Sequence, residues 1–439
     1  MQRRKRNSIF MNSLPTKKQA WFGWCMYDWA NSAFATVILS AVLPVYFVAL
    51  VPEEGARISF LGFSRTLRAT SLWGYAVSCS MLIVAVTSPY LGSIADRLSL
   101  HRKFLFAYCL LGVLSTSLLF FATPGSYLLA SLLFIIANIG FAGGNVFYNA
   151  FLPKLAANHE LDRLSSRGFA YGYLGGGIAL LLVFGLIQGY SSLGFPDKGA
   201  ASRTGFLLTG FWWLLFTIPT YKYLRTPASP IMPDRLHRGI RGYFRIFAEI
   251  KKYPSLLLFL IAFLFYNDGI QTIIVVAAIF AREELGLSQG TILACFLMIQ
   301  FVAMPGTLLF GRLAGLFGAK RSLYLALFLF ILVTVYAYFM NKAWEFWLLG
   351  FIIAIILGGS QAVSRSFFST LIPEGKHAEF FGFYAISAKF ASVFGPFVFA
   401  IIVDITGSAR LSILALTFFF VVGMFLLSRV KEENQLATA

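Results

Sequence analysis

Four ionisable side chains lie inside apolar stretches that are long enough to span a bilayer, and they are the residues best suited to chemistry. They are Asp28, Asp268, Arg365 and Lys389. A charge inside a membrane is costly, so such residues usually face a bundle interior or a watery path for an ion or solute. The planar fork of arginine matches a carboxylate, and a carboxylate can meet an ammonium group or a proton. Alternatively, the two acids and the two cations could form two buried salt bridges with a structural role.

Amide side chains accompany these charges at helical spacings. Asn31 lies three residues after the first acid, Gln271 three after the second, and Gln361 four before the arginine, so each shares a helix face with its charge. A further stretch carries three amides spaced by seven and four residues on one face: Asn138, Asn145 and Asn149. Such amides either bond neighbouring helices or line a polar path. We therefore treat all six as candidate substrate- or ion-binding residues.

Twelve apolar segments position these residues. The chain is 58% hydrophobic and 12% charged, with a mean hydropathy of +0.76, and windows of about 20 apolar residues match the thickness of a bilayer core. The segments are 21–51, 70–95, 103–122, 127–150, 168–190, 204–224, 254–281, 288–311, 320–340, 343–368, 380–404 and 408–430. The pattern predicts an all-α polytopic membrane protein with twelve transmembrane helices.

The positive charge follows the gaps between these segments. The formal net charge is +18, and with the N-terminus inside, 27 of the 36 Lys and Arg residues fall in the tails and alternate loops on one side. Basic residues concentrate on the cytoplasmic side of membrane proteins. The pattern therefore places both termini in the cytoplasm, predicts contact with a lipid bilayer and argues against nucleic-acid binding.

The chain divides into two six-helix halves. We expect a cytoplasmic tail at 1–20, a bundle at 21–224, a basic linker at 225–253, a second bundle at 254–430 and a short tail at 431–439. Basic residues of the linker can also lie against anionic lipid. Parallel repeats with a binding site between them are typical of transporters.

A loop motif occurs in both halves. The first copy contains Gly92, Asp96, Arg97 and Arg102. The second copy contains Gly311 and Arg312, with Gly315 at the position of the acid. Taken alone, these charges could be ordinary basic-loop charges.

The motif resembles the signature between helices two and three of the major facilitator superfamily. Four stretches resemble the vacuolar amino-acid effluxer branch of that superfamily and its bacterial relatives: YDWANSAF at 27–34, SSRGFAYGYLGGG at 165–177, FYNDGIQTI at 265–273 and GGSQAVSRSFFSTLIP at 358–373. The resemblance implies a major facilitator fold, transport by alternating access and amino-acid export. It also implies that the loop residues form a latch, which holds the two halves together in the outward-facing state. The second copy of the loop lacks the acid of this latch.

These observations favour a secondary transporter of a small zwitterion such as an amino acid, possible proton coupling, and a monomer in a bacterial inner membrane. Arg365 or Lys389 would meet the substrate carboxylate, and Asp28 or Asp268 its ammonium group or a coupling proton. The alternative is a membrane nutrient sensor that would use the same binding site between the two halves. The tails of this chain, however, are short for signalling. The four Cys and four His show no metal-site spacing, and no nucleophile–base pair indicates an enzyme. No cofactor is expected.

The charge pattern makes a topology prediction. A single cysteine replacing Ser229 in the basic linker should resist a membrane-impermeant thiol reagent added to intact cells, whereas one replacing Ser191 should react. Labelling of the Ser229→Cys variant from outside would reverse the predicted orientation.

Overall fold

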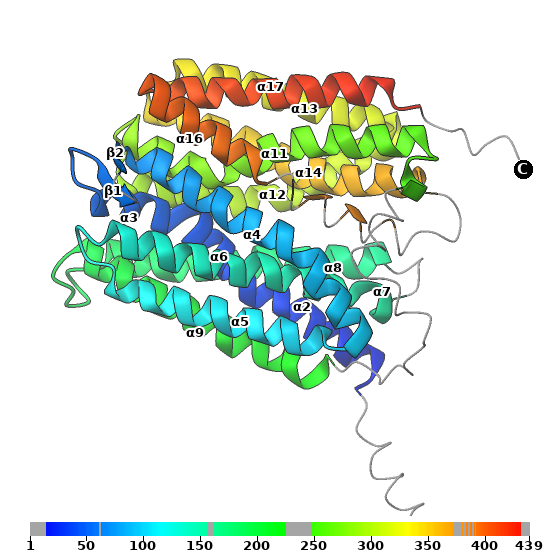
Figure 1. Ribbon diagram of the computed structural model, residues 1–439, viewed down its shortest axis with the longest axis horizontal. Coiled ribbons are helices and arrows are strands. Elements are labelled where there is room, and N and C mark those ends of the chain that lie inside the picture. Colours follow the sequence, from blue (N-terminus) through cyan, green and yellow to red (C-terminus); the bar gives the residue numbers. More distant parts are fainter. Residues whose placement is uncertain are drawn as a thin grey trace, which may run out of the picture.

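The computed structural model is an elongated bundle of helices running side by side (Figure 1). It describes residues 15–60, 63–156, 161–224, 248–372 and 392–431, together with 380, 383, 384, 387, 388 and 390. Among them, ten helical stretches are long and apolar enough to cross a membrane. The predicted linker at 225–253 lies outside the described residues up to 247.

The elements up to residue 224 form an N-terminal group, drawn blue to green in Figure 1. They are α2 (Lys17–Ala33), η1 (Phe34–Ala41), α3 (Val42–Leu50), β1 (Ala56–Phe60), β2 (Phe63–Leu67), α4 (Ala69–Leu98), α5 (His101–Leu118), η2 (Leu119–Phe121), α6 (Tyr127–Asn149), α7 (Leu152–Leu155), α8 (Leu161–Gln188) and α9 (Lys198–Tyr223). The sixth predicted segment coincides with α9 up to Tyr223, and α9 is not among the ten spans.

The later elements form a C-terminal group. They are α11 (Pro254–Glu283), α12 (Gln289–Phe317), α13 (Ala319–Phe339), α14 (Ala343–Thr370), α16 (Phe394–Thr406) and α17 (Ala409–Arg429). The eleventh predicted segment is described only in part, by scattered residues and α16, so the count of twelve helices stays a prediction.

Capping residues explain several helix boundaries. Thr16 and Gln19 form a reciprocal capping box at the start of α2. Asp197 accepts the N–H of Ala200 at the start of α9, at 2.7 Å. Along the helices, apolar side chains remain exposed; Val86, for example, is 64% exposed. Because large exposed apolar surfaces are unfavourable in water, this belt fits contact with lipid.

Two local features were not predicted from the sequence. Residues 51–70 contain an antiparallel hairpin, in which Ala56 pairs with Leu67 and Phe60 with Phe63. The first span is not one continuous α-helix, because η1 has the wider turns of a π-helix between α2 and α3. Such π-helical turns are common at functional sites, and Leu39 of η1 reaches the cavity described below.

Buried apolar side chains form two clusters among the described residues. The larger joins the N-terminal group to the ends of the C-terminal helices nearest β1 and β2, and it includes Phe280 and Phe399. The second, which includes Phe259 and Phe420, belongs to the C-terminal group alone. The two groups therefore share a core at the hairpin end, where β1 and β2 lie. Among the described residues, no buried apolar cluster joins the groups at the opposite, linker end, where α9 ends and α11 begins.

Hydrogen bonds between the groups also gather at the hairpin end. The indole of Trp73 on α4 donates to the carbonyl of Val275 on α11, at 2.8 Å. The hydroxyl of Tyr75 on α4 donates to Asp404 of α16, at 2.6 Å. These bonds fix α4 against α11 and α16.

Two acids at the end of α11 complete this closure, and we call them the acidic clasp. Glu283 accepts the backbone N–H of Thr70 at 3.1 Å. Oε1 of Glu284 lies 3.7 Å from Nη1 of Arg68 in the N-terminal group. Its Oε2 lies 3.7 Å from Nε of Arg410 in the C-terminal group. The clasp therefore joins α4 of one group to α11 and α17 of the other.

The clasp predicts that Glu284→Gln loosens the hairpin end. A partly exposed ion pair contributes up to about 1 kcal/mol to stability. Separation of the two groups at the hairpin end should therefore become up to about fivefold more frequent. The measurement is the thiol modification rate of Ser202→Cys in a cysteine-free background, because Ser202 is fully buried and accepts a bond from Gln289 across the groups.

The matched control is Glu54→Gln, which removes an exposed acid near the hairpin and should leave the modification rate unchanged. Equal rates in all three proteins would show that the clasp does not hold the groups together.

Candidate functional site

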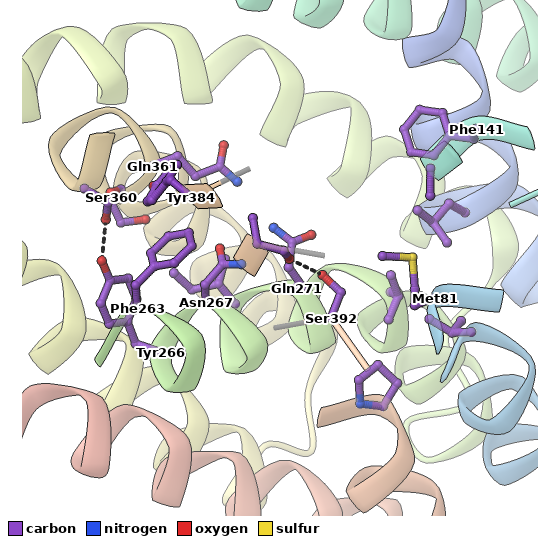
Figure 2. A pocket seen from close by; sticks show the side chains of 18 of the residues that line it. Met81, Phe141, Phe263, Tyr266, Asn267, Gln271, Ser360, Gln361, Tyr384 and Ser392 are labelled. Carbon is purple, nitrogen blue, oxygen red and sulfur yellow. Dashed lines mark hydrogen bonds between the residues drawn. The ribbon is translucent and has the colours of Figure 1, made fainter. Parts of the chain in front are cut away.

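A cavity of about 250 Å³ lies between the two groups. Its walls come from η1, α4, α6 and α8 on one side, and from α11, α14, α16 and the described residues before α16 on the other. In Figure 2, Met81 and Phe141 project from the N-terminal group, while Asn267 and Gln271 of α11 lie near Gln361 of α14. Ligand sites commonly combine apolar walls with a few polar groups in this way.

The polar lining is concentrated on α11 and α14. It consists of Tyr266, Asn267 and Gln271 on α11, Ser360, Gln361, Ser364 and Arg365 on α14, with Asn138, Tyr384 and Ser392 nearby. The hydroxyls of Tyr266 and Ser364 are hydrogen-bonded at 2.8 Å. The predicted residues Asn138, Gln271, Gln361 and Arg365 are therefore brought together here.

Arg365 is the one charged side chain among the described lining residues. Its guanidinium carbon lies 4.8 Å from the centre of the Phe169 ring on α8, a cation–π contact between the groups. The same guanidinium acts electrostatically on Asp28. No acid occurs among the described residues that line the cavity.

Asp28 lies behind the cavity wall rather than in it. It is half-buried, with the hydroxyl of Tyr148 on α6 beside its carboxylate. The first span packs polar residues against glycines of α8, in two rows: Asp28, Ser32 and Thr36 against Gly168, Gly172 and Gly176. A Cβ on the first glycine would stand 3.0 Å from a carboxylate oxygen of Asp28. The glycines thus bring α8 close enough to cover this acid.

The amides predicted from the sequence divide between scaffold and cavity. Asn31 donates to the side-chain oxygen of Asn145 at 2.7 Å, which joins α2 to α6. Asn138 lines the cavity and donates to Ser80 of α4 at 2.7 Å. Asn149, the last residue of α6, is exposed. Only one of the three amides on α6 therefore faces the cavity.

Asp268 is buried on α11 and does not line the cavity, although the preceding Asn267 does. Lys389, the fourth intramembrane charge predicted from the sequence, lies outside the described residues. No group of three His, Cys, Asp or Glu suited to hold a metal occurs in the described part of the chain.

The predicted latch residues lie at the linker end. Gly92 is on α4, where the side chains of Asp96 and Arg97 are not described. Arg102 of α5 donates to the carbonyl of Tyr221 on α9, at 2.7 Å, within its own group. Gly311 and Arg312 are exposed on α12. A latch between the groups stays a prediction.

Several lining residues were missed by the sequence analysis. Ser364 lies four residues after Ser360 and three after Gln361, so both serines extend the polar face of α14, a spacing that was visible. Tyr266, Tyr384 and Phe169 gave no such signal, because aromatic residues are common throughout these segments. Tyr148, which lies beside Asp28, was missed for the same reason.

Comparison with known families and proteins adds independent information. The family described as "Vacuole effluxer Atg22 like" matches residues 16–439. The "Uncharacterized MFS-type transporter YxiO" of Bacillus subtilis is 36% identical over 94% of this chain and 94% of its own. "Autophagy-related protein 22" of Coccidioides immitis is 26% identical, over 90% of this chain and 84% of its own.

Solved transporter structures share the fold. A mutant form of the nucleoside transporter NupG superposes with a TM-score of 0.64 at 16% identity, covering 94% of this chain and 99% of its own. A bacterial homologue of the lysosomal transporter Spinster, in an inward-facing and unoccupied conformation, gives 0.63 at 15% identity, covering 94% and 95%. These likenesses confirm the predicted major facilitator fold.

The pairing of Asn31 with Asn145 predicts energetic coupling. The measurement is a double-mutant cycle in the free energy of unfolding in detergent. Asn31→Ala and Asn145→Ala should show a coupling energy of about 0.6 kcal/mol, which is the average for interhelical hydrogen bonds in a membrane protein. Asn149→Ala, at an exposed position of the same helix, should be additive with Asn31→Ala. Additivity of both pairs would show that the amide bond contributes nothing to stability.

Proposed function

Because the chain belongs to the vacuole effluxer Atg22-like family of major facilitator transporters, we propose that it exports a small solute bearing a carboxylate, such as an amino acid. The observation that carries the proposal is the cavity between the two groups, whose single described charge is Arg365. A volume of about 250 Å³ lies below the range of about 300–1,000 Å³ typical of drug-sized ligands, which suits a small solute.

The membrane orientation follows from the charge pattern. We place the hairpin end outside and the linker end in the cytoplasm, where 27 of the 36 Lys and Arg residues then lie. Among the described residues the buried core joins the two groups at the hairpin end, and in this proposal the arrangement corresponds to an inward-facing conformation. A solute would therefore enter the cavity from the cytoplasm.

Arg365 binds the carboxylate of the solute in this proposal. Its guanidinium can donate two parallel hydrogen bonds to a carboxylate. An ammonium group would be met by neutral oxygens of Asn267, Gln271 and Gln361 and by the Tyr384 ring, all of which line the cavity. Neutral partners are weaker than a carboxylate, so recognition should depend more on the acid group than on the amine.

Transport is driven by a proton gradient in this proposal, with one proton entering as one solute leaves. The two acids Asp28 and Asp268 are the candidates for the proton, because neither lines the cavity. The membrane-sensor alternative has no described soluble domain to support it, and the family relationship favours transport.

The proposal predicts that Arg365→Gln weakens solute binding about 10- to 100-fold, because hydrogen bonds to charged groups contribute about 1.5–3 kcal/mol. Arg365→Lys should recover part of this loss, since it keeps the charge without the fork. The measurement is counterflow in proteoliposomes with labelled amino acids and their deaminated analogues, followed by binding titration of the active solute.

The matched control is Arg321→Gln, which removes an exposed arginine on α13 and should bind the solute as the wild type does. If Arg365→Gln and Arg321→Gln transport the solute equally well, the proposed substrate class is wrong. It is also wrong if the wild type exchanges no solute that bears a carboxylate.

A further inference from the structure

Asp268 is a buried acid that the cavity does not use. It lies near the middle of α11, is 2% exposed and is absent from the cavity lining. Among the described residues its Oδ1 atom has no hydrogen-bond partner. Its neighbour Asn267 faces the cavity, so the acid is one residue away from the proposed solute path.

The start of α16 covers this carboxylate. A Cβ on Gly395, in the first turn of α16, would stand 3.0 Å from Oδ1 and 3.0 Å from the backbone oxygen of Asp268. The absence of a side chain therefore lets the helix lie directly against the acid. The hydroxyl of Thr272 donates to the backbone oxygen of Asp268 at 2.7 Å, so it satisfies the backbone rather than the carboxylate.

Charged groups on the elements packed against α11 are engaged elsewhere. On α14, Arg365 lies over Phe169. On α16, Asp404 accepts a bond from Tyr75. At the start of α17, Arg410 forms an ion pair with Glu284 of the acidic clasp. The other titratable groups described on these elements are Tyr46 on α3, Cys79 and Tyr90 on α4, Cys295 and Arg312 on α12, Glu345 on α14 and Arg429 on α17. No described charged side chain acts on Asp268. The backbone N–H of Gly395 in the first turn of α16 lies close enough to the carboxylate to act on it.

The titratable neighbour on α11 itself, Tyr266, bonds Ser364. Lys389 and the side chains of Asp96 and Arg97 lie outside the described residues. The surroundings that are described therefore supply no cation to the carboxylate.

A buried carboxylate without a cation or a full set of donors is strongly disfavoured, and such a group is neutralised by a proton instead. Asp28 is also covered by a neighbouring helix, but it differs because both the hydroxyl of Tyr148 and the cation Arg365 act on it. Two acids whose surroundings differ in this way take different protonation states.

We propose that Asp268 is the proton-binding site of this transporter, protonated while the hairpin end is closed, whereas Asp28 stays ionised. The proposal deepens the transport function proposed above and rests on it. In each cycle a proton from outside converts the Asp268 carboxylate to the acid. The same proton leaves to the cytoplasm before the cavity carries solute outward.

The contact between α16 and α4 couples the proton to the conformation. A Cβ on Gly74 of α4 would stand 2.7 Å from the carbonyl oxygen of Pro396 and 3.0 Å from the Cβ of Ala400, and Tyr75 bonds Asp404 further along. An ionised Asp268 needs water or new donors, which requires the first turn of α16 to move away. Loss of the proton therefore loosens the closed hairpin end.

The direct test is infrared difference spectroscopy of the purified protein in lipid nanodiscs during a pH change. The wild type should show the carbonyl band of a protonated carboxylic acid, which disappears as the pH rises. Asp268→Asn should lack this band, and Asp28→Asn should keep it. A band that persists in Asp268→Asn, or no such band in the wild type, would overturn the assignment.

Transport provides the second test. In proteoliposomes, Asp268→Asn should retain counterflow of the solute and lose accumulation driven by a pH gradient. A variant that still accumulates solute under a pH gradient would contradict the proposal. Absence of counterflow in the wild type would contradict the proposed function alone, since the infrared result does not depend on a solute.

Folding is controlled within the same variant. Asparagine has the shape of a neutral carboxylic acid, so Asp268→Asn should unfold at a temperature close to that of the wild type. A large loss of thermal stability would indicate that Asp268 is ionised and paired, against the proposal. Gly395→Leu should unfold more readily, because its side chain would displace α16 from the acid.

Discussion

The cost of an unpaired polar group in a membrane interior governs the arrangement of this protein. Asn31 and Asn145 satisfy one another between α2 and α6, and Asn138 bonds Ser80. Arg365 lies at the cavity, where a ligand or water can reach it. These side chains are thus either paired with a neighbouring helix or placed where the two groups of helices separate, whereas Oδ1 of the buried Asp268 has no described hydrogen-bond partner.

Close helix packing decides which parts can move together. Glycines of α8 bring it against the first span around Asp28, and Gly74 lets α4 lie against the backbone of α16. The first contact lies within the N-terminal group and the second lies between the groups. We infer that α2 and α8 move as one unit, while the contact of α4 with α16 breaks and reforms.

The sequence predicted the helices and four of the polar residues at the cavity. Arg365 and Gln361 were identifiable because polar residues are scarce in apolar segments. The position of Asp28 behind the wall was not, since spacing gives the face of a helix but not the helix it meets. The hairpin at 56–67 and the π-helix at 34–41 also depend on packing with distant segments, which hydropathy does not encode.

Alternating access to the cavity is the central claim, and distance measurements across both ends test it most directly. Spin labels at Leu193 and Lys342 would span the hairpin end, and labels at Asn149 and Leu316 the linker end, in nanodiscs at several pH values. Alternating access should give two populations at each end, with one distance lengthening as the other shortens. Fixed distances, or lengthening at both ends together, would contradict it.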